Sequence, residues 1–520
     1  MKNSTLFNKK NFCVLFIFVI SLLINQYYGN KGVFPVDSFA HFDTGFRIFL
    51  GEYPFKNYWI VSGPIVDYIQ AVFFYIFGVN WQSYVLHASL FNAILSLATF
   101  VIFRNFNLNL YYSLLYTLSF SILAYPVSAT PFVDLHSAFF SLLGIYALIL
   151  GIKNEKNIYW IFLPLFFTFA FLSKQVPSSY VIISVIVILS IYSLTHKKYK
   201  WMKYSFSSLI LLIFFLLVFG KIQGIKLSSF LEQYLFYPLT IGSQRFSNYN
   251  FTFEGVVLHF KFIYIALSPL LFINLRKIFF SNKYYKSNNF YYFLTLILFT
   301  LSLILHQLLT RNQTFIFFLI PILFGFSHIY FNLNHFNFKK STSVILILVC
   351  IFVTIKYHIR FNENRKFHEL NYVNFKSFSF AKEIDEKFLG LKWITPEYKN
   401  ETQKEISHIN QIKLHLDKDS RKKMLLTNYS FFSAILNEKL FSPTRWHIFD
   451  GTDYPLTGNK YFINYKNLLI KLIEENNIKV IYTTYPVESS ILYKYLDREC
   501  LEEVKISNIL NSYEIKNCYK

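Results

Sequence analysis

Charged residues are scarce in this 520-residue sequence: they make up 15% of it, whereas a soluble domain carries about a quarter. Acidic residues are especially rare in the first part of the chain, because only eight of the 29 precede His358. The eight are Asp37, Asp43, Glu52, Asp67, Asp134, Glu155, Glu232 and Glu254. This shortage excludes an ordinary soluble protein for residues 1–357, and the 21 acidic residues that follow indicate a soluble region there.

Two further absences narrow the class of protein. No basic stripe with interleaved stacking aromatics is present, so the net charge of +22 does not indicate a nucleic-acid partner. No small-x-small cleavage site follows the apolar run Phe12–Ile24. We therefore interpret this run as an uncleaved first membrane span rather than as a signal peptide.

Long apolar blocks dominate the sequence between Asn11 and Ile355. They are about 17–22 residues long, enough for a helix to cross a hydrocarbon core of about 30 Å. We predict an α-helical polytopic membrane protein with about eleven transmembrane helices. The predicted spans are residues 12–28, 82–103, 109–126, 132–151, 158–173, 176–194, 202–220, 255–275, 289–309, 312–331 and 341–357.

One apolar segment, Pro64–Val79, is not predicted to cross. It is short, it begins with Ser62-Gly63-Pro64 and it carries Asp67. If it crossed, the lysine-rich loops would change sides and the positive-inside bias would be lost. An interfacial or re-entrant helix fits better. A solvated face is the simplest explanation of Asp67.

Lysine and arginine gather in alternate loops, which predicts a cytoplasmic N-terminus. The protein is then expected in the cell (inner) membrane, with membrane lipids around residues 1–357. The first outer loop covers about residues 29–81. Residues 358–520 form a small extracytoplasmic α/β domain, on the periplasmic or extracellular side.

The pattern after residue 358 predicts two strands, Met424–Asn428 and Ile478–Thr483, with a helix at Tyr461–Asn476 between them. Cys500 and Cys518 are joined by a short hairpin-like segment, and an oxidising compartment would allow a disulfide. Two free thiols are the alternative. Two segments are expected to be exposed turns: Thr444–Trp446 and Asp450–Asp453.

Charged and histidine side chains gather in the loops that this topology places on the outer face. Each alone has an ordinary explanation, such as an interfacial anchor or a structural histidine. As a set, their carboxylates can deprotonate an acceptor or hold a divalent cation, and their cations can bind a phosphate leaving group. The set comprises Asp37, His41, Arg47, Glu52, Lys56, Asp134, His136, Lys174, Arg245 and Arg311.

The first loop resembles that of the GT-C glycosyltransferases, in particular the protein O-mannosyltransferase and lipid A aminoarabinose transferase types. The resemblance lies in Asp37-Ser-Phe-Ala-His41, Gly51-Glu-Tyr-Pro-Phe and Ser62-Gly-Pro64, and in the acidic position at the fourth span. It covers roughly residues 12–330. No Lys-Pro-Pro motif follows the loop, so the aminoarabinose-transferase subtype itself is not expected.

The resemblance implies transfer of a sugar, with inversion, from a polyprenyl-phosphate donor to a glycan, lipid or protein acceptor on the outer face. It implies that Asp37 is the catalytic base and that Asp134, with His136 beside it, is a second acidic site residue. Donor phosphate would contact Lys174, Arg245 and Arg311, with His41 and Glu52 as supporting residues. A divalent cation is the one candidate cofactor, and its candidate ligands are Asp37, Asp134 and His136.

Three other classes of function are alternatives to this one. A transporter or flippase of lipid-linked glycans usually has charges near the midplane and paired halves, neither of which is visible here. A many-span polymerase would carry its cations in large late loops, whereas Asp37 lies in the first loop. A non-catalytic scaffold is the remaining alternative, because fold does not determine function.

Overall fold

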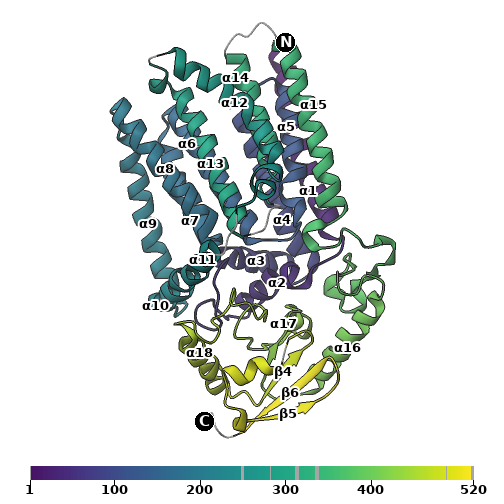
Figure 1. Ribbon diagram of the computed structural model, residues 1–520. Helices are drawn as coiled ribbons and strands as arrows, with labels where there is room; N and C mark the ends of the chain where they lie inside the picture. The colour runs from purple at the N-terminus through teal and green to yellow at the C-terminus, as the bar shows by residue number, and fades with distance from the viewer. Residues whose placement is uncertain are drawn as a thin grey trace. The chain divides into compact units, whose positions relative to one another are not determined.

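The computed structural model describes residues 2–247, 251–281, 283–310, 315–333, 339–487 and 489–516. The chain folds as two compact units, which are treated separately below (Figure 1). The helical unit consists of Met1–Gly29, Ala88–Phe214 and Tyr249–Phe367. The α/β unit consists of Asn30–His87, Phe215–Asn248 and His368–Lys520.

Long apolar helices make up the helical unit, and in Figure 1 they run side by side. One large hydrophobic core, from Ala88 to Phe361, joins most of them, and a small separate cluster holds Cys13 and Ile17 against Phe100. The helices are α1 (Lys2–Gly29), α4 (Trp81–Asn105), α5 (Leu110–Leu123), α6 (Val133–Asn154), α7 (Asn157–Ser173), α8 (Gln175–His196), α9 (Lys200–Ile222), α12 (Lys261–Phe280), α13 (Asn288–Thr310), α14 (Leu319–Leu333) and α15 (Lys339–Tyr357). The unit boundaries fall within α4 and α9.

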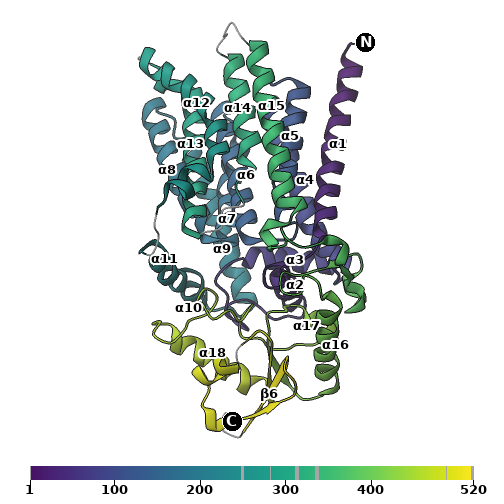
Figure 2. The same ribbon diagram turned by 45° about the vertical axis from the view of Figure 1, so that its right-hand side comes forward.

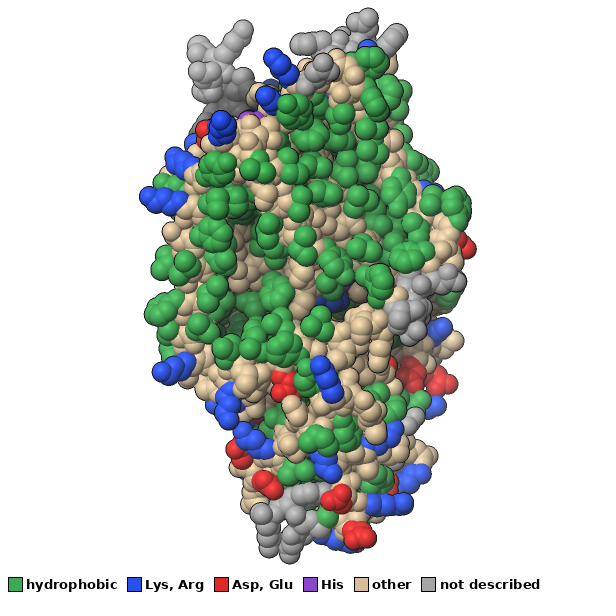
Figure 3. Space-filling model, turned by 60° about the vertical axis from the view of Figure 1, so that its left-hand side comes forward, with side chains coloured by type: hydrophobic (Ala, Val, Ile, Leu, Met, Phe, Trp, Pro, Cys, Tyr) green, Lys and Arg blue, Asp and Glu red, His purple; other side chains and the backbone are tan. Residues whose placement is uncertain are grey.

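Nine helices in the described part of the chain are long and apolar enough to cross a membrane, namely α1, α4, α5, α6, α8, α9, α12, α13 and α15. The other two predicted spans correspond to the shorter apolar helices α7 and α14. In Figure 3 the surface over these helices is largely hydrophobic, as a lipid-facing surface requires. The predicted α-helical membrane fold is confirmed.

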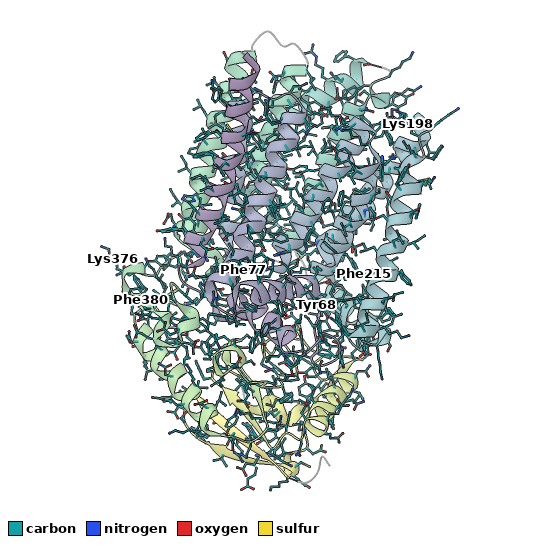
Figure 4. All side chains as sticks on the ribbon, turned by 180° about the vertical axis from the view of Figure 1, so that it is seen from behind. Tyr68, Phe77, Lys198, Phe215, Lys376 and Phe380 are labelled. Atoms are coloured by element: carbon teal, nitrogen blue, oxygen red, sulfur yellow. The ribbon has the colours of Figure 1, made fainter. Side chains whose placement is uncertain are left out.

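The helix at Pro64–Phe77, α3, is 14 residues long, about 21 Å, and it belongs to the α/β unit rather than to the helical unit. Gly63 supplies the left-handed φ of 80° before it, and Pro64 occupies its first turn. Figure 4 labels Tyr68 near its start and Phe77 at its end. α3 packs against α2 (Pro35–Phe49), where a side chain at Gly45 would meet Gln70.

The α/β unit contains a four-stranded sheet in the order β3-β4-β6-β5. β3 and β4 are parallel, with Leu425 opposite Tyr482, and the other neighbours are antiparallel. The predicted strands and the helix between them are confirmed. The strands are β1 (Ser379–Phe380), β2 (Lys392–Trp393), β3 (Lys423–Leu426), β4 (Val480–Thr484), β5 (Leu501–Lys505) and β6 (Leu510–Ile515).

Helices flank this sheet, with α16 and α18 on opposite sides of it in Figures 1 and 2. The two flanking helices are α16 (Thr402–Lys418) and α18 (Phe462–Glu475), and the same unit also contains α10 (Leu227–Phe230), α11 (Tyr237–Ser247) and α17 (Phe432–Leu436). Phe39 of α2 packs against Trp393 and Phe431, with ring centroids 6.0 Å and 4.8 Å away. The first loop therefore shares a hydrophobic core with the C-terminal region inside this unit.

Candidate functional site

The first loop folds into a polar cluster centred on Asp67, which is fully buried. Its carboxylate accepts hydrogen bonds from His41 Nδ1 at 2.6 Å and Thr44 Oγ1 at 2.5 Å, both on α2. Arg445 Nη2 donates to the second oxygen at 3.0 Å. The expectation of a solvated Asp67 is wrong, because α3 turns this side chain toward α2 and away from water.

His41 is therefore bound to Asp67 rather than exposed beside Asp37. Burial, followed by the nearby Arg445 charge, lowers the pKa of His41, so its neutral ring donates through Nδ1. Asp37 lies one turn earlier, in the first turn of α2, and is only half-buried. The helix start favours a carboxylate at this position.

A second buried ion pair joins the last turn of α2 to the segment that follows it. Arg47 Nε donates to Glu52 Oε2 at 2.9 Å, and its guanidinium lies over the Tyr58 ring at 4.1 Å. Although burial alone would lower it, the carboxylates of Glu52 and Asp43 hold the pKa of Arg47 above its ordinary value. Glu52, predicted as a supporting site residue, thus fixes the end of α2.

Asp43 has a pKa of about 6, raised mainly by burial. An unfolded aspartate titrates near pH 3.9. Because the pKa of Asp43 is higher in the folded state than in the unfolded state, its protonated form favours the folded protein. This contribution to the free energy of unfolding is complete below about pH 4 and is lost as the pH rises through about 6. We expect Asp43→Asn to raise the free energy of unfolding by about 1–3 kcal/mol near pH 7.5. Near pH 4 the same substitution should change the free energy of unfolding only slightly. Denaturation at both pH values checks this; an equal difference at both would contradict it.

The loop that supplies Arg445 is also buried. Asp453 accepts hydrogen bonds from Thr444 Oγ1 and from the backbone N–H of Arg445 at 3.2 Å. Burial raises the pKa of Asp453 to about 6. Burial and the Arg47 charge lower the pKa of His447 to about 3. The expectation of exposed turns here is wrong for Thr444, Arg445 and Asp453, because their side chains are buried.

In the helical unit, Asp134 stands at the centre of a second cluster. Lys174 Nζ donates to Asp134 Oδ2 at 2.7 Å, and His306 Nε2 donates to Oδ1 at 2.7 Å. Asp134 opens α6, Lys174 ends α7 and His306 lies near the end of α13. Asp134 and His306 are buried, whereas the Lys174 side chain is 20% exposed. The cluster therefore presents a cation held in place by a carboxylate.

These contacts do not fit a divalent cation on Asp134, because an ammonium group and an imidazole N–H already occupy its two oxygens. His136 faces Tyr125, whose hydroxyl bonds to its Nδ1, and its ring lies 4.4 Å from that of Phe91. Among the described residues, no group of three or more His, Cys, Asp or Glu is arranged to hold a metal ion.

The remaining predicted site residues are Arg245, Arg311 and the two cysteines of the predicted disulfide. Arg245 is exposed in the last turn of α11. Arg311 lies outside the described residues. Cys500 is buried and disulfide-bonded, but its predicted partner Cys518 lies outside the described residues, so the pairing stays a prediction.

Comparison with known proteins bears on this arrangement. Residues 61–221 match the family model of the dolichyl-phosphate-mannose-protein mannosyltransferases. The match begins just before α3, ends in α9 and includes Asp67, Asp134 and Lys174. The predicted resemblance to the protein O-mannosyltransferases is confirmed for residues 61–221, a span that does not include Asp37. No curated protein matches the sequence.

Solved structures that the chain resembles include two of ArnT from Cupriavidus metallidurans. The one bound to undecaprenyl phosphate is 10% identical, with a TM-score of 0.47, and the alignment spans 96% of this chain and 97% of that chain. The apo state is 11% identical with a TM-score of 0.49 and the same coverage. An Archaeoglobus fulgidus oligosaccharyltransferase in complex with Zn and sulfate is 11% identical with a TM-score of 0.44. That alignment spans 90% of this chain and 68% of the oligosaccharyltransferase. These ligands belong to those proteins.

Proposed function

We propose that this protein is a membrane glycosyltransferase that moves a sugar from a polyprenyl-phosphate donor to a glycan, lipid or protein acceptor. The observation that carries the proposal is the match of residues 61–221 to a mannosyltransferase family model. That segment contains Asp134 and Lys174, which form a buried carboxylate–cation pair at the ends of apolar helices. Such a pair inside an apolar helical bundle is costly and is usually tied to function.

Asp37 is the proposed catalytic base. It is half-buried in the first turn of α2, where a helix start favours its negative charge. In the proposed step the carboxylate takes the proton from an acceptor hydroxyl, and the oxygen attacks the anomeric carbon of the donor. A new carbon–oxygen bond forms while the bond to the phosphate oxygen breaks. Polyprenyl phosphate leaves with the electron pair, and one displacement inverts the configuration.

The proposed contact for the leaving phosphate is Lys174, with Arg245 and Arg311 as further candidates. One N–H of the Lys174 ammonium points to Asp134, and two more remain for phosphate oxygens. Asp134 and His306 thus act as positioning residues for that cation. A fixed cation stabilises the charge that develops on the leaving group without having to reorganise.

We further propose that the N-terminus is cytoplasmic and that residues 358–520 form a domain on the outer side of the cell membrane. The distribution of lysine and arginine among the loops supports this orientation. The disulfide at Cys500 supports an oxidising compartment for the C-terminal region.

The exchange Asp37→Asn tests the proposed base. Membranes that contain the wild type are expected to release polyprenyl phosphate from a mixed pool of polyprenyl-phosphate sugars. The variant is expected to do so at least about 100-fold more slowly, since it cannot accept the proton. The matched control is Asp417→Asn, which changes an exposed aspartate on α16. Equal release by Asp37→Asn and wild type, at equal protein levels, would show that Asp37 is not the base.

A further inference from the structure

An open groove of about 730 Å³ lies in the α/β unit, and none of the predicted site residues lines it. Its walls are the loop 396–401, the first turns of α16, Tyr485 after β4 and the turn that joins β5 to β6. This volume is in the usual range for small-molecule sites, about 300–1,000 Å³.

The groove lies where α/β sheets commonly bind ligands. Tyr485 directly follows β4, so it stands at the carboxyl end of the parallel pair β3–β4. Its backbone N–H donates to Ile509 O at 3.0 Å, which ties it to the turn between β5 and β6. In open α/β sheets the crevice outside the carboxyl ends of the strands is the general location of ligand sites.

A buried hydrogen-bond network holds the opposite wall in place. Glu405 accepts from Trp393 Nε1 at 2.8 Å, Thr395 Oγ1 at 2.8 Å and Tyr429 OH at 2.9 Å. Thr395 Oγ1 in turn accepts from the backbone N–H of Tyr398 at 3.3 Å. The start of the 396–401 loop is therefore fixed before any ligand arrives, which lowers the entropic cost of binding.

The lining combines flat aromatic rings with balanced charge. Tyr398 and Tyr485 both line the groove, Tyr485 is 49% exposed, and its hydroxyl bonds to Glu397. Besides the tyrosines, the polar lining comprises two carboxylates, two ammonium groups, two carboxamides and one imidazole: Glu397, Glu401, Lys399, Lys404, Asn400, Asn508 and His408.

This composition selects a class of ligand. The equal numbers of acids and bases disfavour a phosphate or another strong anion, and the charged walls disfavour a lipid chain. Vicinal hydroxyl groups can bond to carboxylates and carboxamides, while the C–H face of a sugar ring packs on tyrosine. A neutral glycan can use both the polar groups and the tyrosine rings, and it adds no charge to a lining in which Glu401 already pairs with Lys404 at 2.9 Å.

We propose that this groove binds a neutral glycan segment of the acceptor. The inference rests on the proposed function, because it specifies what the transferase modifies: an acceptor that already carries sugar residues. The groove is a binding site, and its residues take no part in the chemical step.

Direct binding is the first test. Full-length protein in lipid nanodiscs is titrated with neutral linear trisaccharides of glucose and of mannose, and binding is followed by saturation-transfer NMR. Wild type is expected to bind at least one of them saturably. Tyr485→Ala and Glu397→Gln, both at exposed positions, are expected to weaken binding about tenfold. The control Tyr372→Ala alters a tyrosine that is 87% exposed and does not line the groove. No saturable binding, or equal binding by all four proteins, would overturn the proposal.

Turnover separates this proposal from the proposed function. If donor is consumed, Tyr485→Ala should raise KM for a glycan acceptor about tenfold and leave kcat unchanged. An unchanged KM, or transfer only to an acceptor without sugars, would show that the groove does not bind the acceptor glycan. The proposed transferase function would not be affected by either result. If the glycan binds in the groove but no donor is consumed, the glycan-binding proposal is supported and the proposed transferase function is contradicted.

Discussion

Replacing Asp67 by asparagine is expected to lower the free energy of unfolding by about 3–5 kcal/mol, the usual result of breaking a buried ion pair. Asp67 is fully buried and accepts from His41, Thr44 and Arg445. An asparagine carries no charge, so the buried Arg445 guanidinium would lose its counter-charge. Denaturant unfolding of the purified protein, followed by tryptophan fluorescence, measures the loss.

The matched control is Glu475→Gln, which breaks the exposed pair between Lys471 and Glu475 on α18. It should change the free energy of unfolding by less than about 0.5 kcal/mol. The double variant Asp67→Asn/Arg445→Met removes both charges and should recover part of the stability lost by Asp67→Asn. A loss below about 1 kcal/mol for Asp67→Asn, or additive losses in the double variant, would contradict the described pair.

Replacing Lys174 by methionine should reduce turnover about 100- to 1,000-fold, the effect of removing one preorganised charge that stabilises a transition state. Lys174 is the partly exposed member of the Asp134 cluster, and in the proposed step its charge contacts the leaving phosphate. Kinetics with a polyprenyl-phosphate sugar measure kcat and donor KM. Lys174→Arg keeps the charge and should recover at least about tenfold of the lost activity.

Two further variants separate catalysis from folding. Lys174→Met/Asp134→Asn preserves the net charge of the cluster, so it should be as abundant as wild type and still inactive. Lys198→Met changes an exposed lysine that pairs with Glu155 in the same unit and is labelled in Figure 4. Its activity should stay within about twofold of wild type, as for a surface pair. Full activity of Lys174→Met would remove Lys174 from the donor site.

Much of the fold could be predicted from the sequence, because apolar block length is a local property. Each predicted span overlaps an apolar helix, and Pro64–Val79 with its Ser-Gly-Pro start forms a separate short helix, as its length indicated. The strands around residues 424 and 480 followed from short apolar runs between polar breaks. In each case a single segment carries enough information to determine its own structure.

Side-chain partners could not be predicted in this way, because they join residues far apart in the chain. Arg445 lies 378 positions from Asp67, and His306 lies 172 positions from Asp134. Arg445 occurs in a turn-like segment, which favours an exposed loop, although the neighbouring Trp446 and His447 are residue types that are often at least partly buried. The pairing of Asp134 with Lys174 likewise depends on how α6 and α7 pack, which no local pattern specifies.

The fate of the donor in a purified system tests the central proposal most directly. Wild-type protein in liposomes is given a labelled polyprenyl-phosphate sugar and a mixture of glycan, lipid and peptide acceptors. Mass spectrometry then follows both halves of the donor. A glycosyltransferase predicts one polyprenyl phosphate released for each sugar bound to an acceptor, with inverted configuration. If the sugar stays on its lipid and the intact donor only crosses to the other leaflet, the protein is a transporter and the proposed function is wrong.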